Sequence, residues 1–158
     1  MTAIVVREFR PVEMPVLANL YGASFDEPYP EPVAASLLRT PGAWCHIAFD
    51  GTDGLPVGFA ITRIILDEAE LLSIGALPDA RRRGVATALL DAGFVVARNA
   101  GARTMHLEVG EDNPGAATLY RKHGFRVTGR RPNYYRRADR RPVAALLMTV
   151  DLTDQNSG

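Results

Sequence analysis

Apolar and polar positions alternate along this chain with two different periods, and the change of period predicts both strands and helices. Four short apolar runs predict strands, at residues 4–9, 44–49, 57–61 and 69–77. Two longer segments have the apolar spacing of a one-sided helix, at residues 12–24 and 85–99. The turn-rich segment 50–54 separates the second and third strands, so these strands should form an antiparallel pair.

The pattern continues after residue 100 with further strands and one short helix. Residues 105–109 alternate between apolar and polar side chains, which predicts a strand whose Glu108 points away from the packed layer. Asn113 followed by Pro114 predicts a helix start, and Gly124 is placed to end that helix in the left-handed conformation. Two closing strands are expected, at residues 126–128 and 144–152.

A proline-rich segment interrupts the pattern near the N-terminus. Residues 27–32 carry prolines at three alternate positions, which predicts an extended loop before a short helix through Leu37 and Leu38. Loops of this kind often form the rim of a pocket.

Length and composition indicate one domain. The chain has 158 residues, of which 47% are hydrophobic, enough to build one core. We expect a domain over residues 1–152 and a polar tail over residues 153–158. No run approaches the roughly 20 apolar residues that cross a bilayer, and the first residues lack the layout of a signal peptide. We therefore expect a cytoplasmic protein.

Thiol and imidazole groups are few and widely separated. Cys45 is the one cysteine of the chain, so it cannot form an internal disulfide, and we expect a small core residue. His46, His106 and His123 have no spacing typical of metal ligands. The sequence therefore predicts no metal site.

Charge is balanced overall but unevenly distributed. The formal net charge is zero, yet residues 1–80 hold 4 Lys and Arg against 11 Asp and Glu, whereas residues 121–141 hold 9 against 1. A balanced total argues against general nucleic-acid binding, which usually needs a basic domain. It leaves room for a local anion-binding patch.

One candidate for such a patch is the turn at residues 81–87, between the strand at 69–77 and the helix at 85–99. Gly84 and Ala86 are small enough for a ligand to approach the backbone, and the free N–H groups of a helix start favour an anion such as a pyrophosphate. No Gly-Lys-Ser/Thr P-loop and no three-glycine Rossmann motif is present. Taken alone, the turn fits a solvated basic loop equally well.

Several ordered motifs together resemble the GCN5-related N-acetyltransferase (GNAT) superfamily. They are the segments 71–78, 81–86, 107–109 and 113–125. Within the superfamily the chain resembles the RimI-type ribosomal-protein alanine N-acetyltransferases most, on residues 111–120 and 130–135. The resemblance implies an α/β (α+β) GNAT fold, with a mixed, mostly antiparallel, twisted sheet of about six to seven strands and about four helices.

The resemblance also implies a cofactor site for acetyl-CoA. It assigns backbone contacts with the acetyl and pantetheine end to Ile74, Gly75 and Ala76. It assigns pyrophosphate contacts to the turn and a side-chain contact to Asn113, although an Asn before a proline caps a helix with or without a ligand. The turn residues are Arg82, Arg83, Gly84, Val85, Ala86 and Thr87.

Glu108 and Tyr120 match the general base and general acid of the RimI type. An attacking amine must be neutral, so a carboxylate that removes a proton directly or through water is useful, and a phenol can protonate the departing thiolate. A strand N–H near residues 74–76 could stabilise the carbonyl oxygen. Two structural alternatives stay open: Glu108 pairs with His106 or an arginine, or Tyr120 is a core aromatic.

The molecule that would accept the acetyl group is less well defined by the sequence. Arg131, Tyr134 and Tyr135 are candidate substrate-binding residues, and the expected loop 130–141 fits a solvated surface, ribosomal RNA, or an acidic peptide or small anion. RimI-type enzymes usually carry acidic residues just before the final strand. In this chain the corresponding segment, residues 140–144, carries two arginines instead. Three hypotheses remain: acetylation of a protein N-terminal alanine, acetylation of a small amine, and a non-catalytic acyl-CoA-binding module. A monomer and a dimer are both compatible.

Overall fold

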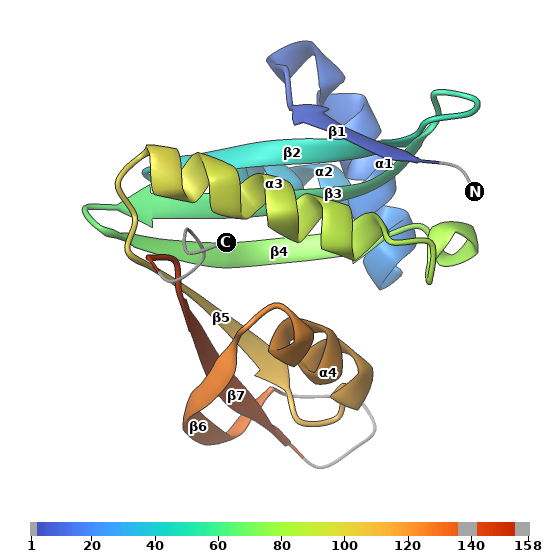
Figure 1. Cartoon of the computed structure of the whole chain (residues 1–158). Helices are drawn as coiled ribbons and strands as arrows, with labels where there is room; N and C mark the ends of the chain where they lie inside the picture. Colours follow the sequence, from blue (N-terminus) through green and yellow to red (C-terminus); the bar gives the residue numbers. More distant parts are fainter. Residues whose placement is uncertain (1–2, 136–141, 154–158) are drawn as a thin grey trace.

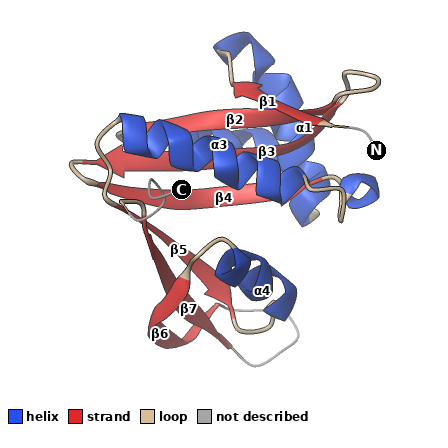
Figure 2. Ribbon diagram, viewed as in Figure 1, coloured by secondary structure: helices blue, strands red, loops and turns tan. Residues whose placement is uncertain are grey.

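The central sheet has seven strands, and all neighbouring pairs but one run antiparallel (Figures 1 and 2). The computed structural model describes residues 3–135 and 142–153. The strand order is β1-β2-β3-β4-β5-β7-β6, and the single parallel pair is β4 with β5. The strands are β1 (Ile4–Glu8), β2 (Ala43–Asp50), β3 (Pro56–Ile65), β4 (Glu68–Ala76), β5 (Thr104–Gly110), β6 (Arg126–Tyr135) and β7 (Val143–Asp151). The predicted fold class is confirmed.

Four α-helices cover the two faces of the sheet. Leu17 and Leu20 of α1 and Ala34 of α2 pack with Ile47 and Phe59 on one face. The helices α3 and α4 pack on the other face, in a core that joins α3 to β5 and β7. The helices are α1 (Met14–Phe25), α2 (Pro30–Leu38), α3 (Val85–Asn99) and α4 (Pro114–Lys122), with short 3-10 turns at Pro11–Glu13 and Pro78–Ala80. In the described residues no helix is long and apolar enough to cross a membrane.

The strands β4 and β5 separate soon after they meet, and this opening defines the site. Their register covers Glu68 to Glu70 of β4 and Thr104 to His106 of β5, although both strands continue further. A bulge opposite Ile61 and Thr62 of β3 leaves Leu72 of β4 outside the ladder. A bulge bends its strand, so β4 turns away from β5 at this point. Figure 1 shows β5 to β7 and α4 diverging from the rest of the sheet.

Two expectations about loops are wrong. The segment 27–32 is not extended throughout, because α2 begins at Pro30. Prolines are tolerated in a first helical turn, where the N–H groups have no partner inside the helix. The strand β6 continues to Tyr135 instead of ending at 128, so Arg131, Tyr134 and Tyr135 belong to a strand. The rest of the expected loop, residues 136–141, lies outside the described part of the chain.

The edge of the sheet at β1 is held by a buried carboxylate. Arg7 Nη1 donates to Glu13 Oε1 at 2.9 Å, and the backbone N–H of Arg10 donates to the same oxygen at 2.8 Å. The Arg7 guanidinium lowers the pKa of Glu13 to about 2. Cys45 is buried in the core beneath α1, as predicted, and burial raises the pKa of its thiol to about 12.

Candidate active site

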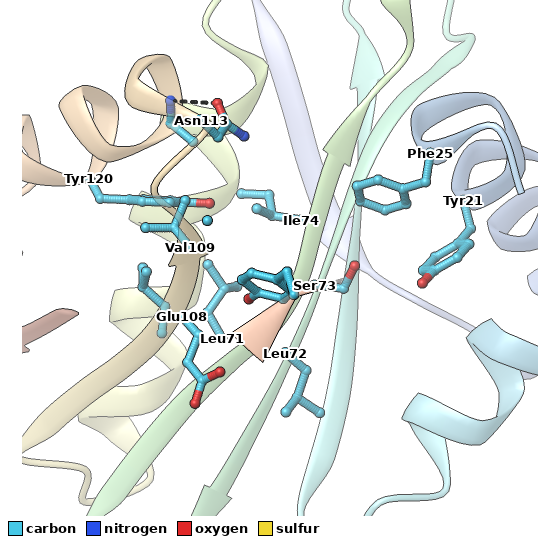
Figure 3. A pocket seen from close by; sticks show the side chains of 14 residues that line it. Tyr21, Phe25, Leu71, Leu72, Ser73, Ile74, Glu108, Val109, Asn113 and Tyr120 are labelled. Carbon is cyan, nitrogen blue, oxygen red and sulfur yellow. Dashed lines mark hydrogen bonds between the residues drawn. The ribbon is translucent and has the colours of Figure 1, made fainter. Parts of the chain in front are cut away.

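A cavity of about 320 Å³ occupies the opening between β4 and β5. Its walls come from α1, β4, β5, α4 and β6, so segments far apart in the sequence meet there (Figure 3). The predicted residues that line it are Ile74, Glu108, Asn113, Tyr120 and Tyr135. The fold therefore brings both candidate catalytic side chains to one cavity.

Tyr120 reaches the cavity from the last turns of α4. Its ring packs edge-on against Phe125 at a centroid distance of 5.8 Å, and 7% of the residue is exposed. Burial raises the pKa of Tyr120 to about 12, and Tyr135 adds to the rise. The phenol therefore keeps its proton at neutral pH. Figure 3 shows the ring extending across the cavity toward Ile74 of β4.

Glu108 lies on β5, on the face opposite the buried Leu107 and Val109, as the alternation predicts. One quarter of its side chain is exposed, and its Oε1 lies 3.4 Å from Arg131 Nη1 of β6. The arginine pairing considered as a structural alternative is therefore present. It coexists with a carboxylate that lines the cavity.

An irregular stretch of β6 shapes the side of the cavity next to Glu108. The ladder between β6 and β7 is interrupted between Arg131 and Tyr135, and Asn133 has a φ of 56°. The interruption lets Tyr134 fold back over Arg131, with 5.3 Å between the guanidinium carbon and the ring centroid. Tyr134 also meets Tyr135 edge-on at 5.2 Å. Arg131, Tyr134 and Tyr135 thus form one cluster beside Glu108.

Asn113 caps α4, as predicted. Its Oδ1 accepts a hydrogen bond from the Ala116 N–H at 3.2 Å, which Figure 3 shows as a dashed line. The same side chain lines the cavity. The capping role is confirmed, and the cofactor contact stays a prediction.

The main chain of β4 offers hydrogen-bonding groups to the cavity. Alternate residues of an antiparallel strand direct their N–H and C=O groups away from the partner strand. Beyond Glu70, no described strand pairs with the edge of β4 that faces β5. Polar groups between residues 71 and 76 therefore face the opening, next to Ile74.

The turn before α3 borders a second cavity of about 270 Å³. Arg82 and Gly84 both have positive φ, 65° and 82°, and Gly84 is the N-cap of α3. The first N–H groups of a helix lack partners within it and carry the positive end of its dipole. The predicted residues at this cavity are Ala76, Arg82, Gly84, Val85, Ala86 and Thr87.

Two predicted cofactor residues line neither cavity. The Arg83 guanidinium is turned to Asp50 at the end of β2, with which it forms an ion pair. Gly75 faces α1 instead, because a Cβ at this position would lie 2.8 Å from both Ser24 Oγ and Phe59 Cε1. Gly75 is therefore needed for the packing of β4 against α1, and a main-chain contact by it stays a prediction.

The three histidines lie apart, and each has a structural setting. His46 is buried beside Val96 of α3, with which it lines a pocket. His123 Nδ1 lies 3.0 Å from the Leu119 carbonyl oxygen, and His106 contacts Thr149 and Glu68. Within residues 3–135 and 142–153, no three His, Cys, Asp or Glu side chains gather in a way that could hold a metal ion.

Some residues that line the cavity were not among the predicted site residues. Tyr21 and Phe25 of α1 and Leu72 of β4 line the cavity opposite α4. Tyr21 falls within the predicted helix at residues 12–24, and its distance from Glu108 in the sequence gives no reason to join the two residues. The bulge at Leu72 depends on pairing between strands, which the local pattern does not encode.

The comparisons with known proteins agree on one protein family. Residues 14–125 match the model of the acetyltransferase (GNAT) family. The [ribosomal protein bS18]-alanine N-acetyltransferase of Escherichia coli is 38% identical over 95 residues, which cover 60% of this chain and 64% of that protein. A putative enzyme of the same name from Bacillus subtilis is 27% identical over 135 residues, covering 85% and 88%.

The fold agrees with a solved structure over nearly the whole chain. The crystal structure of the ribosomal-protein-S18-alanine N-acetyltransferase from Escherichia coli superposes with a TM-score of 0.84 and 28% identity, covering 95% of this chain and 94% of that one. The sequence match spans about two thirds of the Escherichia coli protein, whereas the structural match spans almost all of the solved chain.

Proposed function

This chain belongs to the acetyltransferase (GNAT) family, and we propose that it transfers the acetyl group of acetyl-CoA to the α-amine of an N-terminal alanine on a protein. Members of the family use acetyl-CoA, and the relatives described above are named for a ribosomal protein bS18 alanine. A small-subunit ribosomal protein is therefore the proposed acceptor. The observation that carries the proposal is that Glu108 and Tyr120 line one cavity at the open edge of β4.

The residues around the two cavities fit acetyl-CoA. The turn at residues 82–87 would hold the pyrophosphate through main-chain N–H groups and the positive end of the α3 dipole. The open edge of β4 at residues 74–76 would hold the pantetheine and acetyl end by hydrogen bonds of the kind that strands exchange. Asn113 would add a side-chain contact from the start of α4.

Proton transfer is the part of the reaction that the side chains perform. The amine reaches the site as an ammonium and must lose a proton before its nitrogen can attack the thioester carbonyl. Glu108 takes that proton. As the C–N bond forms and the C–S bond breaks, Tyr120 donates its proton to the leaving sulfur and recovers one from the nitrogen. One proton is thereby released to solvent per acetyl group transferred, and no covalent link to the protein is needed.

The acceptor would enter beside β6. Arg131, Tyr134 and Tyr135 form a wall on one side of Glu108, and Tyr21 and Phe25 form the opposite apolar side. Main-chain groups of β4 near residues 74–76 are suited to stabilise the carbonyl oxygen as it gains charge.

The test is acetyl-CoA consumption by the full chain against two panels. One contains peptides that differ in their first residue and in charge, and the other contains free amino acids, polyamines and aminoglycosides. We expect turnover with alanine-start peptides and none with the same peptides blocked at the α-amine. Turnover confined to free amines would overturn the protein acceptor. No turnover with any acceptor, together with normal acetyl-CoA binding, would favour a binding module.

A further inference from the structure

Asp50, the last residue of β2, contacts the turn that precedes α3. Its Oδ2 accepts a hydrogen bond from Arg83 Nη2, a residue 33 positions away in the sequence. Its Oδ1 accepts from the backbone N–H of Thr52 at 2.8 Å. Asp50 is buried, with 7% of its surface exposed, and Arg83 holds the pKa of its carboxyl below the usual value.

The main chain around Asp50 is fixed from several directions. Its N–H donates to the Leu55 carbonyl at 2.9 Å, and its carbonyl accepts from the Gly54 N–H at 2.8 Å. Asp50 is also paired with Ile4 of β1. The carboxylate is therefore presented by a rigid strand end and not by a mobile loop.

The turn that Asp50 contacts has a conformation that needs support. Arg83 lies between Arg82 and Gly84, both of which have positive φ. A residue with a Cβ is destabilised in that region relative to the right-handed conformation. The Arg81 guanidinium makes a second link, donating to the Ser24 carbonyl of α1 at 3.4 Å. The turn is thus tied to β2 on one side and to α1 on the other.

The ion pair between Arg83 and Asp50 also determines which groups of the turn can contact an anion. The Arg83 side chain is turned away and does not line the cavity, whereas Arg82 and the helix-start residues do. We propose that Asp50 is a positioning residue for acetyl-CoA binding, which holds the turn through Arg83 so that its N–H groups face the pyrophosphate. This inference rests on the proposed function, because it takes acetyl-CoA as the ligand.

The test is isothermal titration of acetyl-CoA into the full chain and its D50N variant, which keeps the shape and removes the charge. We expect D50N to raise the Kd by about tenfold, the size of one lost charge-assisted hydrogen bond. The kcat at saturating acetyl-CoA should change less than about twofold, because the side chains that move protons are untouched. The matched control is E70Q, which breaks the 2.9 Å pair of Arg63 and Glu70 and should leave the Kd unchanged.

A second variant separates positioning from direct contact. If Arg83 acts only through Asp50, R83M should weaken binding about as much as D50N, and the double variant should be no weaker than either one. Tighter or unchanged binding by D50N, or a further loss in the double variant, would overturn the inference. Absence of acetyl-CoA binding by the unsubstituted chain would overturn the proposed function itself. Circular dichroism of each variant without ligand shows whether it is folded.

Discussion

The two halves of the sheet are built differently. In the N-terminal half, residues 3–99, the strands β2 and β3 are buried from both faces by α1 and α3, and most of their side chains are apolar. In the C-terminal half, residues 104–153, β6 is an edge strand whose positions are mostly exposed. The packed half carries the proposed cofactor turn, and the open half carries the proposed acid, base and acceptor wall.

The difference in packing implies a difference in what holds each half in place. The turn before α3 contacts the buried carboxylate of Asp50 through Arg83, and Gly58 of β3 lies close to Val85 at the start of α3. The ion pairs of β6 are more exposed: Arg131 of the wall pairs with Glu108 at 3.4 Å, and the neighbouring Arg130 pairs with Glu111 at 2.5 Å. Exposed pairs contribute little and are screened by salt. The affinity for acetyl-CoA should therefore depend little on ionic strength. The affinity for the acceptor should change with ionic strength and with substitutions on β6.

The largest expected effect separates chemistry from cofactor binding. Tyr120→Phe removes the proposed general acid and keeps the ring against Phe125, so kcat should fall by about 100-fold or more. The Kd for acetyl-CoA, from isothermal titration, should stay within about twofold. Tyr29→Phe, at an exposed tyrosine, is the control and should retain full activity. Unchanged kcat in Tyr120→Phe would remove this residue from the mechanism.

The next largest effect is expected from a substitution that tests the close packing of the N-terminal half. A Cβ at Gly58 would lie 2.5 Å from Val85 Cγ1 and 2.8 Å from the Gly75 carbonyl oxygen. Gly58→Ala should therefore lower the free energy of unfolding by about 1–3 kcal/mol and displace the start of α3, which weakens acetyl-CoA binding. Chemical denaturation and titration measure the two effects.

Gly93→Ala is the matched control for that substitution, because among the described residues no heavy atom outside the neighbouring backbone of α3 lies within 4 Å of a Cβ at Gly93. Alanine in a helix interior is favoured over glycine, so this change should leave the fold as stable or more stable. Equal destabilisation by both substitutions would show that crowding between β3 and α3 is not the cause.

A smaller effect is expected at the acceptor wall. Arg131→Gln removes a half-exposed ion pair, so the KM for the peptide should rise by about fivefold or less, with the KM for acetyl-CoA unchanged. Added salt should reduce the difference between variant and wild type. Arg126→Gln, on the same strand and exposed, is the control. A change in the acetyl-CoA KM alone would contradict the separation between the two halves.

The smallest expected effect on acetyl transfer is at the outer edge of the N-terminal half, where the quantity that changes is the stability of the fold. The pKa of Glu13 is lowered from 4.5 to about 2 in the folded state, so its pairing with Arg7 stabilises the fold above pH 4.5 and is lost as the pH falls toward 2. Thermal melting should show this loss over that range. Glu13→Gln should be less stable than wild type at pH 7 and should show a smaller change on acidification.

The sequence predicted most elements because their patterns are local. The helix at 85–99 has the predicted bounds, Asn113 caps α4, and Gly124 has a φ of 94°. The mostly antiparallel mixed sheet followed from the family resemblance and agrees with the structure. The prediction of a loop at 130–135 is wrong because β6 is exposed on both faces. The sequence of β6 therefore lacks the alternation of apolar and polar residues that marks a half-buried strand.

The site was predictable only in part, for a similar reason. Motifs along the chain identified the turn at 82–87, Glu108 and Tyr120, and the fold places each of them at a cavity. The ion pairs of Arg83 with Asp50 and of Arg131 with Glu108 could not be read from spacing, because each joins residues from different strands or turns. The apolar side formed by Tyr21 and Phe25 depends in the same way on how α1 packs against β4.

The most direct test of the division between the two halves is isothermal titration of acetyl-CoA into the double variant Glu108→Gln/Tyr120→Phe, followed by an acetyl-transfer assay on the same sample. We expect this variant to bind acetyl-CoA with a Kd within about twofold of the wild type while transferring no measurable acetyl group to an alanine-start peptide. Loss of acetyl-CoA binding, or transfer at the wild-type rate, would contradict this expectation.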